Sequence, residues 1–397
     1  MKKLLQINIT SNIGSTGRIV ENLGLLAQKN GWESYIGCFE SNESSSQIIG
    51  IGGKIDFFNH VLQTRFFDNH GFASVNSTKK FITEIEKINP DVIHLHNLHG
   101  YYLNISLLFE YLKKSNKRVF WTLYDCWSFT GHCSYFDLVK CDKWKKECNN
   151  CPNKKEYPKS IFLDKSRENF IKKKQLFNGV KNLTIIVNSN WLKSKVKNSY
   201  LSNYKIEMIP NGINLNDFKP VIKSDKKNEL NLRGKFIILG IASQWNERKG
   251  LSEFIKISQR LNEDERIVLD GLNDKQRRNL PNTIIALDRA KSIKELVILY
   301  SMADVFVNAT KEDNFPTTNL EALACGTPVV TYNTGGSPES VGSKTGYVVE
   351  KEDIESLMIK IREVKKRGAK TFFNDCVKKA NLEFNHIDNY QKIINLF

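Results

Sequence analysis

One stretch decides the fold of this chain: Asp313-Asn314-Phe315-Pro316-Thr317-Thr318-Asn319-Leu320-Glu321-Ala322-Leu323-Ala324-Cys325-Gly326. It follows an apolar run, residues 303–309, that is typical of a buried strand, and a second apolar run begins at residue 329. Pro316 suits the first turn of a helix, where its missing N–H is not needed, and Gly326 is a helix stop signal. The order of strand, polar loop, short helix and strand predicts an α/β unit whose helix begins at the carboxyl edge of a parallel sheet.

This loop and helix carry two carboxylates. Asp313 lies just ahead of the expected helix, and Glu321 lies a turn or more into it. Free amides at a helix N-terminus hold phosphate, aided by the helix dipole. One carboxylate near the mouth of such a site and one deeper can hold two sets of hydroxyl groups, as in a nucleotide sugar. The plainer alternative is a surface carboxylate followed by a helix-stabilising Glu.

The two acids resemble the acidic, seven-spacer, acidic motif of family 4 retaining glycosyltransferases, which have the GT-B fold. In that family the first acid contacts the transferred sugar and the second binds the ribose. The resemblance therefore implies that Asp313 positions the donor sugar and that Glu321 holds the ribose, although Asp313 is one methylene shorter than the more common Glu. It also implies that the donor is bound by the residues that follow the first acid: Asn314, Phe315, Pro316 and Thr317.

Length and charge narrow the class of protein. A chain of 397 residues predicts two domains, and no apolar run approaches the ~20 residues of a membrane span. Residues 4–9 are too short for a signal peptide and read as a first strand, so we expect a cytosolic protein. The net charge of +16 fits a solvated lysine-rich face, attraction to anionic lipid head groups, or nucleic-acid binding.

A glycine-containing loop, residues 10–18, follows the first strand and precedes a helix that we expect to start near Ile19. It is not the dinucleotide fingerprint, because Gly14 and Gly17 are one residue too far apart. In family 4 the matching loop reaches toward the donor, which makes Gly17 a candidate donor-binding residue. A tight turn with close helix packing is the alternative.

Histidines gather around the end of another expected strand, residues 91–96. His94, His96 and His99 fall where a parallel strand would deliver them to a ligand site. Hydrogen-bonded packing, or lining of the acceptor side by His96 and His99, is favoured over metal binding, because no carboxylate pattern accompanies them.

The next strand ends in Tyr124-Asp125, where the family usually has His-Asp. The resemblance makes Asp125 the first candidate for contact with the acceptor and places it among the catalytic residues. Because Tyr124 replaces the usual histidine, we hypothesise that His132 substitutes for it in space.

A cluster of four cysteines follows: Cys133, Cys141, Cys148 and Cys151. Four cysteines within 19 residues of a cytosolic chain favour structural zinc over free thiols, and free thiols over disulfides. The loop, with Trp127 to Gly131, Cys141 to Trp144 and Cys148 to Pro152, resembles that of a surface-polysaccharide assembly subgroup of family 4, of the colanic-acid and O-antigen type.

The second domain is expected after a linker at residues 215–232, whose lysine-rich part includes residues 223–228. Its first strand leads to Arg248 and Lys249, two cations ahead of a helix that can neutralise a diphosphate leaving group. Lys249 matches the family lysine and is a catalytic candidate, whereas the family arginine is replaced by Ser243, so Arg248 is expected to supply part of that charge. The resemblance also makes Arg289 a donor-binding candidate near the base.

Taken together, the sequence predicts a GT-B protein with two doubly wound Rossmann-like domains facing across a cleft: residues 1–215 on the acceptor side, joined by a C-terminal helix at about residues 380–397, and residues 216–379 on the donor side. We expect retaining transfer of a sugar from a nucleotide-diphosphate donor to an oligosaccharide linked to a polyprenyl diphosphate. We expect no catalytic metal and no nucleic-acid partner, and we expect peripheral association with the inner face of the cell membrane. The alternatives are a zinc-containing nucleic-acid-binding protein and a nicotinamide-dependent oxidoreductase, although the latter lacks the glycine fingerprint.

Overall fold

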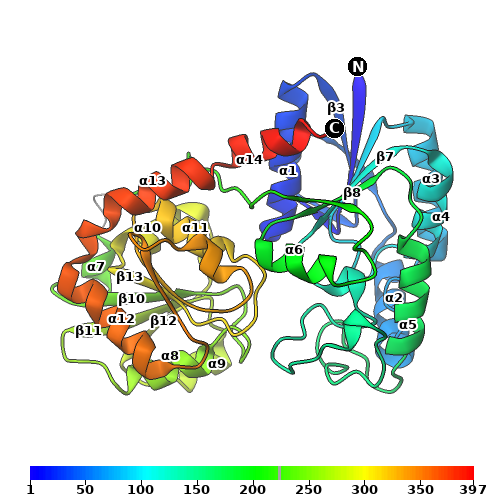
Figure 1. Ribbon diagram of the computed structural model, residues 1–397. Coiled ribbons are helices and arrows are strands. Elements are labelled where there is room, and N and C mark those ends of the chain that lie inside the picture. The colour runs from blue at the N-terminus through cyan, green and yellow to red at the C-terminus, as the bar shows by residue number, and fades with distance from the viewer. Residues whose placement is uncertain (222–224) are drawn as a thin grey trace. The chain divides into compact units, whose positions relative to one another are not determined.

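A computed structural model describes residues 1–221 and 225–397 of the chain (Figure 1). The chain divides into two compact units. Unit 1 comprises Met1–Pro210 and Tyr390–Phe397, and unit 2 comprises Asn211–Asn389. The domain limits given from the sequence stay predictions, and residues 222–224 of the expected linker lie outside the described residues.

Unit 1 is built on a parallel seven-stranded sheet with the order β5-β3-β1-β6-β7-β8-β9. Its strands are β1 (Lys2–Ile7), β3 (Trp32–Cys38), β5 (Gln47–Gly50), β6 (Val92–Leu95), β7 (Arg118–Leu123), β8 (Leu183–Val187) and β9 (Lys205–Met208). A small second sheet pairs β2 (Thr10–Ser11) with β4 (Glu40–Ser41). The chain winds outward in opposite directions from β1 and β6, and ligands of such sheets bind beyond the carboxyl ends of the strands at this reversal.

The helices of unit 1 are α1 (Gly14–Lys29), α2 (Lys54–Phe67), α3 (Val75–Ile88), α4 (Ile105–Ser115), α5 (Ser166–Phe177) and α6 (Asn190–Lys197). Helix α14 (His386–Ile394) begins in unit 2 and ends in unit 1, where the ring of Phe397 lies 5.9 Å from that of Trp32. Helix α1 begins at Gly14, earlier than the sequence suggested, because the glycine-containing loop continues directly into the helix.

Unit 2 contains a parallel six-stranded sheet with the order β12-β11-β10-β13-β14-β15. Its strands are β10 (Phe236–Ile241), β11 (Glu265–Asp270), β12 (Ile284–Leu287), β13 (Val305–Asn308), β14 (Val329–Tyr332) and β15 (Gly346–Val349). Here the winding reverses between β10 and β13. The loops after these two strands carry Lys249 and Asp313, so the topology brings the two residues to the same edge of the sheet.

The helices of unit 2 are α7 (Lys226–Glu229), α8 (Leu251–Ser258), α9 (Asp274–Arg278), α10 (Ile293–Met302), α11 (Thr317–Ala324), α12 (Ile354–Arg367) and α13 (Phe373–Glu383). Short 3-10 turns occur at Trp127–Phe129, Lys143–Lys145, Ser337–Ser340 and Ala369–Thr371. Each sheet is covered by apolar side chains of its own unit, and each unit has its own core. Among the described residues, no helix combines the length and the apolar character needed to cross a bilayer.

Candidate active site

An ion pair forms the centre of the candidate donor site in unit 2. Lys249 Nζ lies 2.6 Å from Asp313 Oδ2, and both side chains are largely shielded from solvent. Arg248 lies beside them and donates from Nη1 to the carbonyl oxygen of Glu312 at 2.7 Å. The fold therefore brings together the two cations and the first acid that the sequence singled out.

Two glycines allow the loops of this site to approach so closely. Gly250 has φ +79°, and a Cβ at this position would lie 2.2 Å from the carbonyl oxygen of Ala309. Gly335 has φ +55°, and a Cβ there would lie 1.6 Å from the carbonyl oxygen of Asp313. Only glycine accepts such a backbone without steric strain. The loops after β10 and β14 can therefore pack directly against the loop that carries Asp313.

The electrostatics of Asp313 favour its charged form. Burial alone would raise the pKa of this carboxyl. The charges of Lys249 and Arg248, the hydrogen bond from Lys249 and the backbone hydrogen bond from Asn314 outweigh burial and hold the pKa below its usual value. Asp313 is thus a carboxylate that can accept hydrogen bonds from hydroxyl groups.

The second acid lies deeper, on α11. Glu321 is 6% exposed, and its Oε2 accepts a hydrogen bond of 2.8 Å from the hydroxyl of Tyr300 on α10. Burial, and then the neighbouring charge of Glu321, raise the pKa of Tyr300, so its hydroxyl keeps the proton that it donates. Tyr300 could not be identified from the sequence, because it is separated from Glu321 by 21 positions and belongs to no motif.

Lys311 is a second residue that sequence reasoning missed. Its Nζ pairs with Glu247, with Glu253 at 3.3 Å and with Glu352 at 3.1 Å. Burial alone would lower the pKa of Lys311, but the hydrogen bonds and charges of these carboxylates raise it above its usual value. One buried ammonium thus joins the loops after β10 and β13 to α8 and to the turn after β15, and it fixes the surroundings of Lys249.

The remaining donor-binding candidates lie outside the Lys249–Asp313 ion pair. Asn314, Phe315 and Pro316 are buried, and Thr317 is half-buried at the first turn of α11. Arg289 is exposed just after β12, near Asp270, whose pKa burial raises to about 6. Gly17 lies in unit 1 on the first turn of α1, where a Cβ would approach Thr10 Oγ1 to 2.8 Å. This contact fits the close-packing alternative for Gly17, and its role toward the donor stays a prediction.

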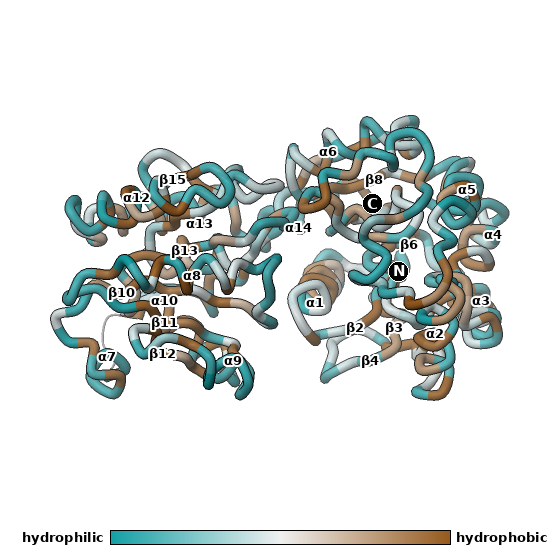
Figure 2. Tube along the Cα trace, turned by 90° about the horizontal axis from the view of Figure 1, so that it is seen from below, coloured by the Kyte–Doolittle hydropathy of each residue, from teal (hydrophilic) through white to brown (hydrophobic). Residues whose placement is uncertain are grey.

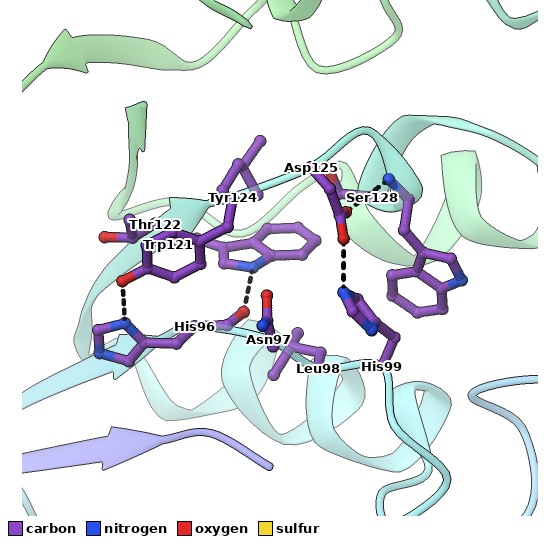
Figure 3. Close-up of a pocket in the computed structure, with 11 residues that line it drawn as sticks. His96, Asn97, Leu98, His99, Trp121, Thr122, Tyr124, Asp125 and Ser128 are labelled. Carbon is purple, nitrogen blue, oxygen red and sulfur yellow. Dashed lines mark hydrogen bonds and ion pairs between the residues drawn. The ribbon is translucent and has the colours of Figure 1, made fainter. Parts of the chain in front are cut away.

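Unit 1 has a small pocket beyond the carboxyl ends of β6 and β7 (Figure 3). His99 Nε2 lies 2.9 Å from Asp125 Oδ2, and His99 Nδ1 lies 2.9 Å from the hydroxyl of Tyr157. Asp125 Oδ1 accepts a hydrogen bond of 2.9 Å from the Trp127 amide. Burial alone would raise the pKa of Asp125, but His99, this amide and Lys173 lower it below its usual value.

His96 and Tyr124 line the same pocket and contact each other. His96 Nδ1 lies 3.0 Å from the Tyr124 hydroxyl (Figure 3). His96 Nε2 lies 3.1 Å from Gln6 Oε1. Burial, with a smaller contribution from His94, lowers the pKa of His96 well below its usual value. His94 is buried with Nε2 2.7 Å from Thr122 Oγ1, so these two histidines are hydrogen-bonded parts of the interior.

His132 lies outside the pocket that contains Asp125 and Tyr124. Its Nδ1 lies 2.6 Å from Asp68 Oδ1, both side chains are fully buried, and His132 is absent from the residues that line the His99–Asp125 pocket. Burial alone would lower the pKa of His132, but Asp68 raises it. The neighbours of Asp125 and Tyr124 are instead His99 and His96, so the substitution hypothesised for His132 finds no support in this placement.

His132 lines a second, small cavity together with Cys133, Cys141, Cys148 and Cys151. All four cysteines are free thiols. A hydrogen bond from Cys133 lowers the pKa of Cys151 to about 7, and Cys148 Sγ accepts from the Gly131 amide at 3.2 Å. Within residues 1–221 and 225–397, however, no group of three or more His, Cys, Asp or Glu side chains is arranged to hold a metal ion. The arrangement of these side chains therefore does not show the expected zinc site.

Two family descriptions match the chain in succession. Residues 16–217 match "Glycosyltransferase Family 4", and residues 222–380 match "Glycosyl transferases group 1". The first alone spans more than half of the 397 residues. Neither description supports the alternative of a nucleic-acid-binding protein.

Individual proteins show the same likeness. A protein of Escherichia coli (strain K12) named as a colanic acid biosynthesis glycosyl transferase, WcaC, is 24% identical over 326 residues, which cover 80% of this chain and 78% of that protein. A UDP-Gal:alpha-D-GlcNAc-diphosphoundecaprenol alpha-1,3-galactosyltransferase of Escherichia coli is 27% identical over 220 residues, or 51% of this chain and 56% of that protein. The solved structure of a sucrose-phosphate synthase from Thermosynechococcus elongatus superposes with a TM-score of 0.73 at 18% identity, covering 100% of this chain and 98% of that one.

Proposed function

Because this chain belongs to glycosyltransferase family 4, we propose that it moves a sugar from a nucleotide-diphosphate donor to a hydroxyl of a lipid-linked oligosaccharide, with retention at the anomeric carbon. The chain has the GT-B fold, with a Rossmann-like domain in each unit. The observation that carries the site assignment is the Lys249–Asp313 pair at the reversal point of the unit 2 sheet, directly before the N-terminus of α11.

The residues of unit 2 suit the parts of such a donor. Departure of a nucleoside diphosphate leaves negative charge, which the ammonium of Lys249, the guanidinium of Arg248 and the first amides of α11 can offset. Asp313 accepts hydrogen bonds from the donor sugar. Glu321, held by Tyr300, accepts them from the ribose. When a diphosphate binds, Lys249 can turn from Asp313 to a phosphate oxygen.

The proposed reaction needs no separate general base. The bond from the anomeric carbon to the phosphate oxygen breaks, and the acceptor oxygen bonds to the same face of that carbon. The proton of the acceptor hydroxyl passes to a leaving phosphate oxygen, so atoms and charges balance. We propose that this chemistry proceeds without a divalent metal.

The acceptor side is proposed for the pocket in unit 1. Asp125 and His99 offer an acceptor and a donor for sugar hydroxyl groups, and His96 with Tyr124 extends the polar lining. An oligosaccharide on a polyprenyl diphosphate is proposed as the acceptor, because a relative is named for a GlcNAc-diphosphoundecaprenol substrate, which is a sugar on a polyprenyl diphosphate. Because such an acceptor is anchored in the membrane, we also propose that the protein associates peripherally with the cytoplasmic face of the cell membrane.

Structural zinc in the four-cysteine loop stays a separate proposal. Its support is that the four thiols line one cavity. Metal analysis of purified protein should find about one zinc per chain, and replacing Cys133 and Cys148 with Ser should remove it. Zinc-free protein with full activity would contradict this proposal without touching the catalytic one.

The donor assignment is tested by thermal shift with UDP-, GDP- and dTDP-sugars. We expect one nucleotide class to raise the Tm of the wild type, because a ligand that binds only the folded state stabilises it. Glu321→Ala should weaken that nucleotide about tenfold, since a buried carboxylate that bonds the ribose is lost. Glu339→Ala, on a neighbouring 3-10 turn, serves as the control. Unchanged affinity in Glu321→Ala would show that the ribose is bound elsewhere.

A further inference from the structure

Helix α2 is amphipathic, but its apolar face points to the solvent and its polar face points to the protein interior. Its buried residues are the polar His60 and Thr64. Its solvent-exposed face is apolar, with positions spaced by three or four residues, and Figure 2 shows brown, hydrophobic stretches along this helix. The exposed fractions are 86% for Ile55, 63% for Phe58, 55% for Leu62 and 42% for Phe66. A helix in water normally turns such a face inward.

A second segment, residues 157–163, extends this apolar face. The Phe66 and Phe162 rings are stacked with centroids 5.4 Å apart, and the Ile161 amide donates to the carbonyl oxygen of Arg65 at 2.8 Å. Phe162 is 63% exposed, and Ile161 and Leu163 are exposed as well. The side chains that form this apolar surface are Ile55, Phe58, Leu62, Phe66, Phe67, Ile161, Phe162 and Leu163. A contiguous patch of this kind marks an interaction site, unlike apolar residues that are exposed singly.

The charge around the apolar surface is positive. Residues 54–67 and 154–165 contain six Lys or Arg and three Asp or Glu, an excess of three positive charges. Two of the acids are engaged by the backbone, since Asp56 accepts from the Gly53 amide and Asp164 accepts from the Cys151 and Ser166 amides. An apolar surface whose segments carry excess positive charge complements a bilayer that contains anionic lipids.

The same segment reaches the acceptor pocket. Tyr157, at its start, contacts His99 through its hydroxyl. On the inner side of α2, Phe57 stacks on Phe39 and lies edge-on to Tyr101, whose ring is 4.8 Å from that of His70. The apolar surface and the His99–Asp125 pocket are therefore connected by directly packed residues of unit 1.

From this arrangement we propose that the apolar surface of α2 and residues 157–163 inserts into the interfacial region of an anionic bilayer. Its position beside the pocket, which rests on the proposed function, brings a membrane-embedded acceptor to Asp125. The docking itself depends only on the exposed apolar face and its lysines.

The test is co-sedimentation of the full chain with vesicles of phosphatidylglycerol and phosphatidylethanolamine, compared with pure phosphatidylcholine vesicles. We expect the wild type to bind the anionic vesicles, and binding to weaken as salt is raised, because screening removes the electrostatic part. Phe58→Ser combined with Leu62→Ser should lower the partition coefficient at least tenfold, since two inserted apolar side chains are lost. Ile359→Ser combined with Leu382→Ser removes exposed apolar residues of unit 2 and should bind as the wild type does.

Two further measurements separate the outcomes. If Phe58→Ser/Leu62→Ser binds vesicles like the wild type, the proposal is overturned. It is also overturned if light scattering shows a wild-type dimer that this variant dissociates while no vesicle binding occurs, because the surface would then join two copies. A nucleotide-induced thermal shift that persists in the double variant shows that its fold and donor site are intact. Vesicle binding without any sugar transfer would leave the docking surface standing and refute the proposed function.

Discussion

The candidate sites in the two units both place a carboxylate beside a nitrogen, but the two pairs differ in charge. In unit 2, Asp313 faces the ammonium of Lys249, with the guanidinium of Arg248 at its side. In unit 1, Asp125 faces His99, an imidazole that carries charge only when protonated. A leaving diphosphate needs fixed positive charge, whereas an acceptor hydroxyl needs hydrogen-bond partners. This difference in charge fits the proposed division of the two substrates between the units, and it can be tested residue by residue.

The largest effect is expected for Lys249→Ala. Loss of a cation that stabilises the leaving group should lower kcat by about 10²- to 10³-fold, in the range found when one such stabilising group is removed. The affinity for the nucleotide should fall much less. Steady-state transfer of labelled sugar, together with equilibrium binding of the nucleotide, separates the two effects. Lys360→Ala, which breaks an exposed Lys–Glu pair on α12, is the control. A wild-type kcat in Lys249→Ala would remove the charge argument for unit 2.

A smaller effect, on the other substrate, is expected for Asp125→Asn. The amide oxygen can still accept from His99, but the charge-assisted bond is lost, which is worth about 1.5–3 kcal/mol. We expect kcat/KM for the acceptor to fall about 10- to 100-fold while donor affinity stays unchanged. Asp137→Asn removes a carboxylate from a partly exposed pair with Lys195 in the same unit and serves as the matched control. Equal losses for donor and acceptor would contradict the division of substrates between the units.

The smallest effect concerns stability and pH. Burial raises the pKa of Asp270 to about 6, so between pH 3.8 and 6 the folded chain holds this proton more firmly than the unfolded chain does. The stability contributed by this group therefore falls as pH rises through that window. Asp270→Asn removes the fall and should stabilise the protein by about 1 kcal/mol at pH 7.5, less than the full linkage value because solvent screens part of the cost. Thermal unfolding from pH 4 to 7.5 should show the variant's advantage growing with pH, and a constant difference would contradict this origin.

The same contrast explains what could be predicted from sequence. The unit 2 site could be recognised because Asp313 and Glu321 are held by one loop and one short helix, so their spacing along the chain reflects their spacing in the fold. To place Lys249 beside Asp313, it was enough to infer that the two parallel strands before them end at the same edge of the sheet. The matches to glycosyltransferase family descriptions confirm the predicted family, and the two parallel sheets with the superposed solved structure confirm the predicted GT-B fold.

The partners of the unit 1 residues could not be found in this way. His99 contacts Asp125 and Tyr157 across 26 and 58 positions of the chain, and no local pattern links them. His132 lies near Tyr124 in the sequence, but in the fold its Nδ1 contacts Asp68, which is 64 positions away. The exposed face of α2 also escaped notice, because an amphipathic pattern gives the period of a helix and not which side faces the solvent.

The buried ammonium of Lys311 has one more consequence. Three glutamates, Glu247, Glu253 and Glu352, form ion pairs with this ammonium. Replacing any one of them therefore changes the electrostatic energy of the remaining ion pairs. We therefore expect the effects of substitutions at these positions on stability to be coupled rather than additive.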